Sequence, residues 1–194
     1  IINSPMANPF EQIRADSNQG QKSFNWYMNQ VRNVAGGINN PRSAMASSIT
    51  TRVPIYEIGS MYLFRYDAKH KNRLPYFDAF PLCLPFEPTN DGFWGMNLHY
   101  LPYLLRARLL GKLLETLDDQ AITSQSQMQY NWDLLSSAAR FPEVKPCVKR
   151  YLTSQLRSGF HKINPEDWKA AIFLPVEDFN TNKGTVFSDS RSMM

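Results

Sequence analysis

The sequence is poor in the side chains that build reactive or metal-binding centres. Among its 194 residues there are two cysteines and three histidines. His70, His99 and His161 lie far apart and lack the close spacing of zinc ligands. Cys147 has no base partner that the sequence can assign, and no glycine-rich phosphate loop is present. We therefore expect a protein that is not an enzyme and that uses no cofactor and no metal ion.

Disulfides and membrane spans are also not expected. Cys83 and Cys147 are too few for a disulfide framework, which favours a reducing compartment such as a bacterial cytoplasm. The most apolar stretch, residues 104–117, is interrupted by basic side chains and falls short of the ~20 apolar residues that a span needs. Residues 1–21 lack the basic and apolar regions of a signal peptide. These patterns predict no contact with a membrane.

Aromatic and strand-like sequence is concentrated in residues 58–101. Within it, residues 61–66 read MYLFRY. Alternate residues of a strand point to opposite faces, so Tyr62, Phe64 and Tyr66 would form one aromatic face. Packing in a core is the favoured interpretation of this face, and stacking on unpaired bases is the alternative.

Further strand signals follow in the same stretch. Residues 80–86 form an apolar run with two prolines, which predicts an edge strand or one bounded by its prolines. Residues 88–92 predict a tight hairpin in which Asp-Gly takes up positive φ angles, and residues 93–99 predict the returning strand. We expect an α+β fold in which a small antiparallel SH3-like sheet or barrel, about residues 55–101, is flanked by several helices.

Helical periodicity flanks this stretch on both sides. We expect helices from Ser23 to the Gly36-Gly37 pair, over residues 102–117, 132–139 and 144–156, and from a strong start at Asn164-Pro165. Residues 39–52 are small and polar and predict a linker or extended arm, and residues 118–129 predict a loop. The expected organisation is an N-terminal helix and arm (1–52), an α+β core (53–179) and a C-terminal tail (180–194).

Three long strings suggest a family. IGSMYLFRYDAKHKNRLPYFDAFPLCLPFE, GFWGMNLHYLP and WKAAIFLPVEDF resemble a group of small proteins encoded by contractile-tailed bacteriophages. The resemblance covers roughly residues 55–179. It implies a virion assembly component, either a part of the tail, baseplate or neck or a DNA end protector that caps the packaged genome. It implies no particular functional residues.

Basic side chains are the remaining candidates for a binding surface. The chain has 21 Lys and Arg against 17 Asp and Glu, a net charge of +4, so local clustering matters more than the total. Solvated faces are one interpretation, and a phosphate-contacting surface is the other. The candidates for contacts with nucleic acid or a protein partner are Lys69, His70, Lys71, Arg73, Arg106, Arg108, Lys112, Lys145, Lys149, Arg150 and Arg157.

Two functional hypotheses follow, and an enzyme with an unrecognised site is a third, weaker one. The first is a non-enzymatic structural component of the tail, baseplate or neck, which docks neighbouring subunits in a symmetric assembly through extended arms. The alternative is a DNA-binding packaging factor or end protector that uses the basic residues. Both hypotheses place the protein in a virion assembled in the bacterial cytoplasm. Its expected partners are other virion proteins and, in the alternative hypothesis, DNA.

Overall fold

The computed structural model describes residues 8, 10–17, 22–34, 36–115, 136, 139, 142 and 144–192. In chain order the elements are α1 (Glu11–Ser17), α2 (Phe24–Val34), α3 (Pro41–Ala46), β1 (Thr50–Val53), β2 (Met61–Leu63), β3 (Leu82–Thr89), β4 (Gly92–Asn97), η1 (Leu98–Tyr100), α4 (Tyr103–Glu115), η2 (Lys145–Cys147), β5 (Val148–Leu152), η3 (Thr153–Gln155), β6 (Phe160–Ile163), η4 (Pro165–Asp167), α6 (Trp168–Ala171) and α7 (Lys183–Ser192).

The strands of the described residues form one six-stranded sheet in the order β1-β6-β2-β3-β4-β5. Every pairing is antiparallel, so the predicted mixture of helices with an antiparallel sheet is confirmed. The sheet is open, with β1 and β5 at its edges, and the structure does not confirm the predicted SH3-like barrel. It also reaches beyond residues 55–101, since β1, β5 and β6 lie outside that stretch.

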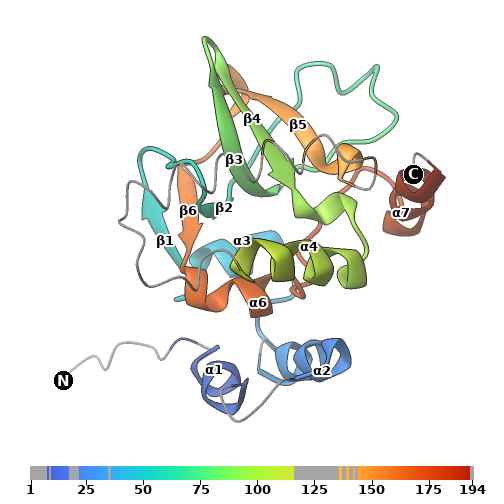
Figure 1. Cartoon of the computed structure of the whole chain (residues 1–194). Helices are drawn as coiled ribbons and strands as arrows, with labels where there is room; N and C mark the ends of the chain where they lie inside the picture. Colours follow the sequence, from blue (N-terminus) through green and yellow to red (C-terminus); the bar gives the residue numbers. More distant parts are fainter. Residues whose placement is uncertain are drawn as a thin grey trace.

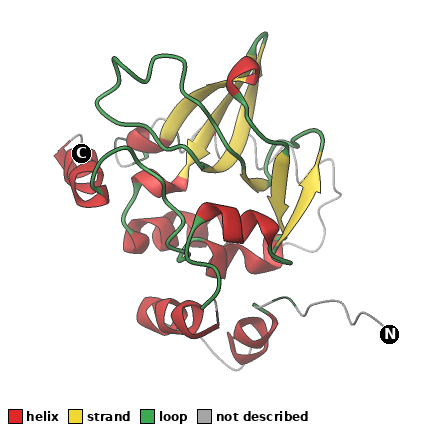
Figure 2. Cartoon of the chain, turned by 180° about the vertical axis from the view of Figure 1, so that it is seen from behind, coloured by secondary structure: helices red, strands yellow, loops and turns green. Residues whose placement is uncertain are grey.

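Helices cover one side of this sheet in layers (Figure 1). In that view α3, α4 and α6 lie below the strands, and α1 and α2 lie further below. The rings of Phe24 on α2 and Phe173 after α6 meet edge to face, with centroids 5.4 Å apart. α7 lies to one side of the sheet, and the long loop of residues 64–81 projects on that same side when the molecule is seen from behind (Figure 2).

The alternation of residues 61–66 separates two apolar cores. Met61 and Leu63 join the larger core between sheet and helices. Tyr62, Phe64 and Tyr66 join a second, aromatic cluster on the other face. In this cluster the ring of Phe64 meets that of Tyr151 edge to face at 5.3 Å, an arrangement that aromatic quadrupoles favour. Tyr62 and Phe64 are fully buried and Tyr66 is 8% exposed, so this face packs in a core and presents no stacking platform.

β3 is a central strand, so the interpretation of residues 80–86 as an edge strand is wrong. It pairs with both β2 and β4. Its register against β4 shifts between Pro85 and Glu87, and such a bulge tolerates a residue that has no backbone donor. The carbonyl of Pro85 still accepts a hydrogen bond from the N–H of Gly59 at 3.2 Å. Gly59 has a φ of 84°, which glycine adopts without strain.

The hairpin between β3 and β4 is confirmed, but Gly92 is needed there for a different structural reason from the one predicted. Among the described residues only Gly59 has a positive φ, so Asp91 and Gly92 do not take up the expected conformation. A Cβ on Gly92 would lie 1.8 Å from the carbonyl oxygen of Tyr151 on β5. The glycine is required because the neighbouring strand passes so close.

Residues 144–156 form no long helix. They form η2, β5 and η3, and β5 pairs with β4 through Phe93↔Tyr151 and Trp94↔Arg150. The apolar pattern of a short amphipathic segment is compatible with either a helix or a strand. Here pairing with the available strand β4 favours the strand. Pro146 inside the predicted helix was the local signal against it.

The expected arm over residues 39–52 and the expected C-terminal tail both contain elements that pack on their own chain. Residues 39–52 contain α3, which a capping box between Asn40 and Ser43 starts, and β1, which pairs with β6. The linker interpretation is therefore wrong. The C-terminal segment forms α7, on which Val186 is fully buried. The division of the chain after residues 52 and 179 stays a prediction.

Several predicted helix boundaries are confirmed. The hydroxyl of Ser23 accepts the N–H of Trp26 at 3.2 Å and starts α2, and α4 occupies the leucine-rich stretch. The chain turns helical at Pro165, although Asn164 makes no side-chain cap bond. The predicted loop over residues 118–129 lies outside the described residues, as does most of the helix predicted at 132–139.

The close approach of β4 and β5 gives a stability test. Gly92→Ala is expected to lower the free energy of unfolding by about 3 kcal/mol, near the upper end for an overpacked site, as measured by urea denaturation. Gly111→Ala is the control, because no described heavy atom lies within 4 Å of its added Cβ and alanine favours the helix by ~1 kcal/mol. A G92A variant as stable as the parent would contradict the proposed close packing.

Candidate nucleic-acid interface

Five of the eleven predicted basic side chains gather in one place. Lys69, His70, Lys71 and Arg73 are exposed on residues 67–75, and exposed Arg157 lies beside them. We call residues 67–75 together with Arg157 the basic loop. The carboxylate of Asp67 joins its parts, 2.9 Å from Lys71 Nζ and 3.5 Å from an Arg157 guanidinium nitrogen.

Backbone hydrogen bonds hold the base of the basic loop. The N–H of Asp67 donates to Gln155 O at 3.0 Å, and the N–H of Arg157 donates to Arg65 O at 2.9 Å. On the returning side, the N–H of Phe77 donates to the side-chain oxygen of Asn180 at 2.7 Å. The loop therefore presents its cations from a base that residues 153–158 and 178–180 fix in position.

Asp67 only partly neutralises the basic loop. The hydrogen bond from Lys71 and the nearby charges of Lys71 and Arg157 lower the pKa of Asp67. Asp67 pairs with two of the four Lys and Arg side chains of the basic loop, and among the described residues it forms no ion pair with Lys69 or Arg73. Exposed ion pairs of this kind contribute little to stability, so a phosphate can replace Asp67 as the partner of Lys71 or Arg157 at small cost.

The other predicted basic residues do not join this cluster. Arg150 on β5 pairs with Asp91 in the β3–β4 turn at 2.7 Å. Lys149 is half-buried, with its ammonium 4.0 Å from the ring centre of Tyr100, and burial lowers the pKa of Lys149.

Three further candidates are on α4 and η2. Arg108 is exposed on α4 and Lys145 is exposed on η2. Lys112 belongs to α4, but its side chain lies outside the described part of the structure. The eleven predicted basic residues therefore do not form one continuous surface.

Arg106 is not a surface residue, and its prediction as one is wrong. Its side chain has no exposed area. The guanidinium donates to the carbonyls of Leu101 at 2.6 Å, Ile172 at 3.0 Å and His99 at 3.2 Å, and it forms an ion pair with Glu177. A buried charge is tolerated only when it is paired and its donors are satisfied. Arg106 therefore has a structural role and cannot contact DNA.

A second buried polar pair lies at the end of the loop that carries the basic residues. Nδ1 of His99 lies 2.7 Å from Oδ2 of Asp78. The same carboxylate accepts the side-chain amide of Asn97 at 3.0 Å and the N–H of Phe80 at 3.0 Å. Burial acts to raise the pKa of Asp78, but the charge of His99 and these hydrogen bonds outweigh it, so the pKa is lowered.

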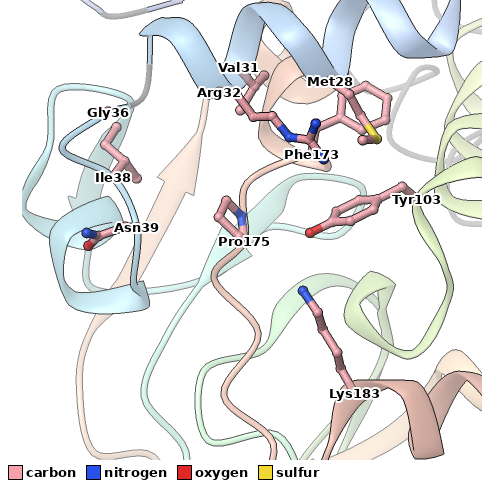
Figure 3. A pocket seen from close by; sticks show the side chains of 10 residues that line it. All are labelled: Met28, Val31, Arg32, Gly36, Ile38, Asn39, Tyr103, Phe173, Pro175 and Lys183. Atoms are coloured by element: carbon pink, nitrogen blue, oxygen red, sulfur yellow. The ribbon is translucent and has the colours of Figure 1, made fainter.

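Sequence reasoning missed a pocket on the helical side of the molecule (Figure 3). It has a volume of about 360 Å³, and it is lined by α2, the segment after it, α4, the segment after α6 and the start of α7. Two cations, Arg32 and Lys183, border it beside Tyr103 and Phe173. No spacing in the sequence connects residue 32 to residue 183, so only the fold could bring them together.

The charges around the pocket act on Tyr103. The ammonium of Lys183 is 5.9 Å from the centre of its ring, and the guanidinium of Arg106 is 4.7 Å away. Burial and the nearby charge of Glu177 raise the pKa of Tyr103, while the charges of Arg106 and Arg32 act in the opposite direction. Glu177 is itself paired with Arg106. No acidic side chain is among the residues that line the pocket. The site is therefore suited to an anion.

Over the described residues, no group of three or more His, Cys, Asp or Glu side chains could hold a metal ion. No helix in that part of the chain is long and apolar enough to cross a membrane. The fold and the site define an α+β protein with exposed cations on a fixed loop and with a cationic pocket.

Comparison with known proteins gives the family. A family model described as phage T4 terminal DNA protecting protein matches residues 10–193, and the chain belongs to this family. No curated protein and no solved structure matches the chain. The resemblance to proteins of contractile-tailed phages is confirmed. The match supports the DNA end protector, which was the alternative hypothesis, rather than the tail, baseplate or neck.

The buried ion pair gives a second stability test. Arg106→Met is expected to lower the free energy of unfolding by about 3–5 kcal/mol, because Glu177 is left buried without its partner. Arg108→Gln, at an exposed position of the same helix, is the control and is expected to stay within ~0.5 kcal/mol of the parent. Equal stability of the two variants, measured by urea denaturation, would show that the pair is dispensable.

The buried carboxylates predict how stability depends on pH. Burial acts to raise the pKa of Glu177, but the charge of Arg106 outweighs it, so the folded-state pKa of Glu177 is lowered from 4.5. The folded-state pKa of Asp78 is lowered from 3.8 for the reasons given above. The unfolded chain then binds more protons, so stability rises with pH in this range.

We expect a constant contribution above about pH 5 and a progressive loss as the pH falls through 4.5 and below. Urea denaturation at a series of pH values measures how the free energy of unfolding changes with pH. Asp78→Asn should flatten the acid limb of the curve, whatever its effect at neutral pH. An unchanged slope in this variant would remove Asp78 as its source.

Proposed function

We propose that this protein binds terminal DNA through its basic loop and shields the end by occupying it. The observation that carries the proposal is the family match over residues 10–193. The name of that family, terminal DNA protecting protein, supplies the ligand, and the basic loop supplies the contacts. Shielding needs no reaction, because a terminus covered by protein is sterically closed to an exonuclease.

The charges of the basic loop support contact with a phosphate backbone. Lys69, Lys71, Arg73 and Arg157 are all exposed on it. Lys and Arg side chains that contact phosphates release counterions from DNA, and this release gives affinity without sequence preference. Such contacts suit a ligand defined by being an end rather than by its sequence.

The protein would act inside the phage particle beside other virion proteins. This part of the proposal is independent of the arms that the sequence suggested. The segments 39–52 and 180–192 fold against their own chain, so they do not support docking through extended arms.

The basic loop gives a direct test by gel shift on linear DNA at several salt concentrations. The variant Lys69→Gln/Lys71→Gln/Arg73→Gln is expected to bind more weakly. Its log–log salt slope should fall by about two to three units, near 0.9 for each phosphate that the protein no longer neutralises. The variant should also fail to protect the linear DNA from an exonuclease.

The matched control is Arg42→Gln/Arg52→Gln/Lys169→Gln, which removes the same charge from exposed sites elsewhere. It is expected to keep most of the affinity and the protection. If both triple variants weaken binding equally, net charge rather than the basic loop is responsible. Equal binding of the parent protein to linear DNA and covalently closed circles would overturn the proposed function.

A further inference from the structure

We propose that the pocket between α2, α4 and α7 binds the terminal nucleotide of a DNA strand and holds its phosphate monoester between Arg32 and Lys183. This inference rests on the proposed function and identifies what distinguishes an end from the rest of the duplex. The basic loop supplies general affinity for the backbone, whereas the pocket recognises the terminus.

Charge is the first argument. A phosphate monoester carries close to two negative charges at neutral pH, whereas each phosphate inside a strand is a diester with one. The pocket offers two cations from distant parts of the chain, Arg32 on α2 and Lys183 on α7. Neither has an ion pair among the described residues, and no acid lines the pocket. Two unneutralised cations match a terminal phosphate better than an internal one.

Size and lining are the second argument. A volume of about 360 Å³ lies at the lower end for small-ligand sites, so it suits one nucleotide rather than a duplex. Val31, Ile38 and Pro175 give it apolar walls for a sugar and base. In Figure 3 the hydroxyl of Tyr103 points into the space between Arg32 and Lys183, where it can donate to a phosphate oxygen.

Connection to the basic loop is the third argument. Pro175 and Lys183 line the pocket, and the segment between them runs past the base of the loop. Within it the N–H of Asn180 donates to Phe77 O at 3.3 Å, and its side chain accepts the N–H of Phe77. The loop and α7 also lie on the same side of the molecule in both views (Figures 1 and 2). One strand of DNA held by the basic loop can therefore place its end at the pocket.

The test compares three forms of one linear duplex, with 5′-phosphate, 3′-phosphate or only hydroxyl groups at its ends. The parent protein is expected to bind a phosphorylated form about tenfold more tightly than the hydroxyl form, the size of one charge-assisted contact. The form that gains affinity identifies which strand end enters the pocket. In Arg32→Gln/Lys183→Gln this preference should disappear while the salt-dependent affinity for linear DNA remains.

Controls separate the two sites. Arg42→Gln, an exposed arginine outside the pocket lining, should keep the preference. The triple variant of the basic loop should lose affinity for all three duplexes but keep the ratio between them. Thermal unfolding checks that each variant is folded. Titration with deoxynucleoside 5′- and 3′-monophosphates tests the pocket without a duplex: the monophosphate that matches the preferred duplex end is expected to bind more tightly than the free deoxynucleoside, and equal binding would contradict the pocket assignment.

The outcomes also separate the two proposals. If linear DNA is preferred over closed circles but terminal phosphates have no effect, the pocket assignment is wrong and the proposed function stands. The same holds if R32Q/K183Q discriminates as well as the parent. If linear and circular DNA bind equally, both proposals fail together.

Discussion

The arrangement of helices around the sheet depends on one buried guanidinium. Arg106 on α4 reaches the carbonyl of His99 after β4, that of Ile172 after α6, and the carboxylate of Glu177 on the way to α7. A charge without solvent is stable only while all these partners stay in place. The pocket borders the same elements, since Tyr103 and Phe173 are close neighbours of these contacts along the chain. The contacts of Arg106 therefore help to position two of the residues that line the pocket.

The second buried pair, Asp78 and His99, connects these contacts to the basic loop. Asp78 receives hydrogen bonds from the N–H groups of Phe80 and Asp178, from the amide of Asn97, and contacts His99. His99 in turn offers its carbonyl to Arg106. A continuous chain of buried polar contacts thus runs from the helices, through the end of β4, to the base of the basic loop. The cations of the basic loop are exposed, but the base of the loop is held by contacts with buried residues.

Local patterns were enough to predict much of the fold and part of the site. The alternation of residues 61–66, the hairpin after β3 and the helix from Ser23 are short-range features, and so are the cations of the basic loop. Arg106 could not be recognised, because a helical arginine beside leucines has the same local pattern whether its partners are water or distant carbonyls. β5 was missed since its strand partner β4 lies far away in sequence. Arg32 and Lys183 share a pocket only because the fold brings residues of α2 and the start of α7 to the lining of the same cavity.

The strand order has a consequence for how the chain reaches its final form. β6, the last strand among the described residues, lies between β1 and β2, which come first and do not pair with each other. On a ribosome, β1 has no strand partner, and β2 can pair only with β3, until residues 160–163 emerge. Contacts over such long separations slow folding, and incomplete chains expose unpaired edges that favour aggregation. The edges of β1 and β2 are therefore the parts of the sheet that stay unpaired longest during synthesis.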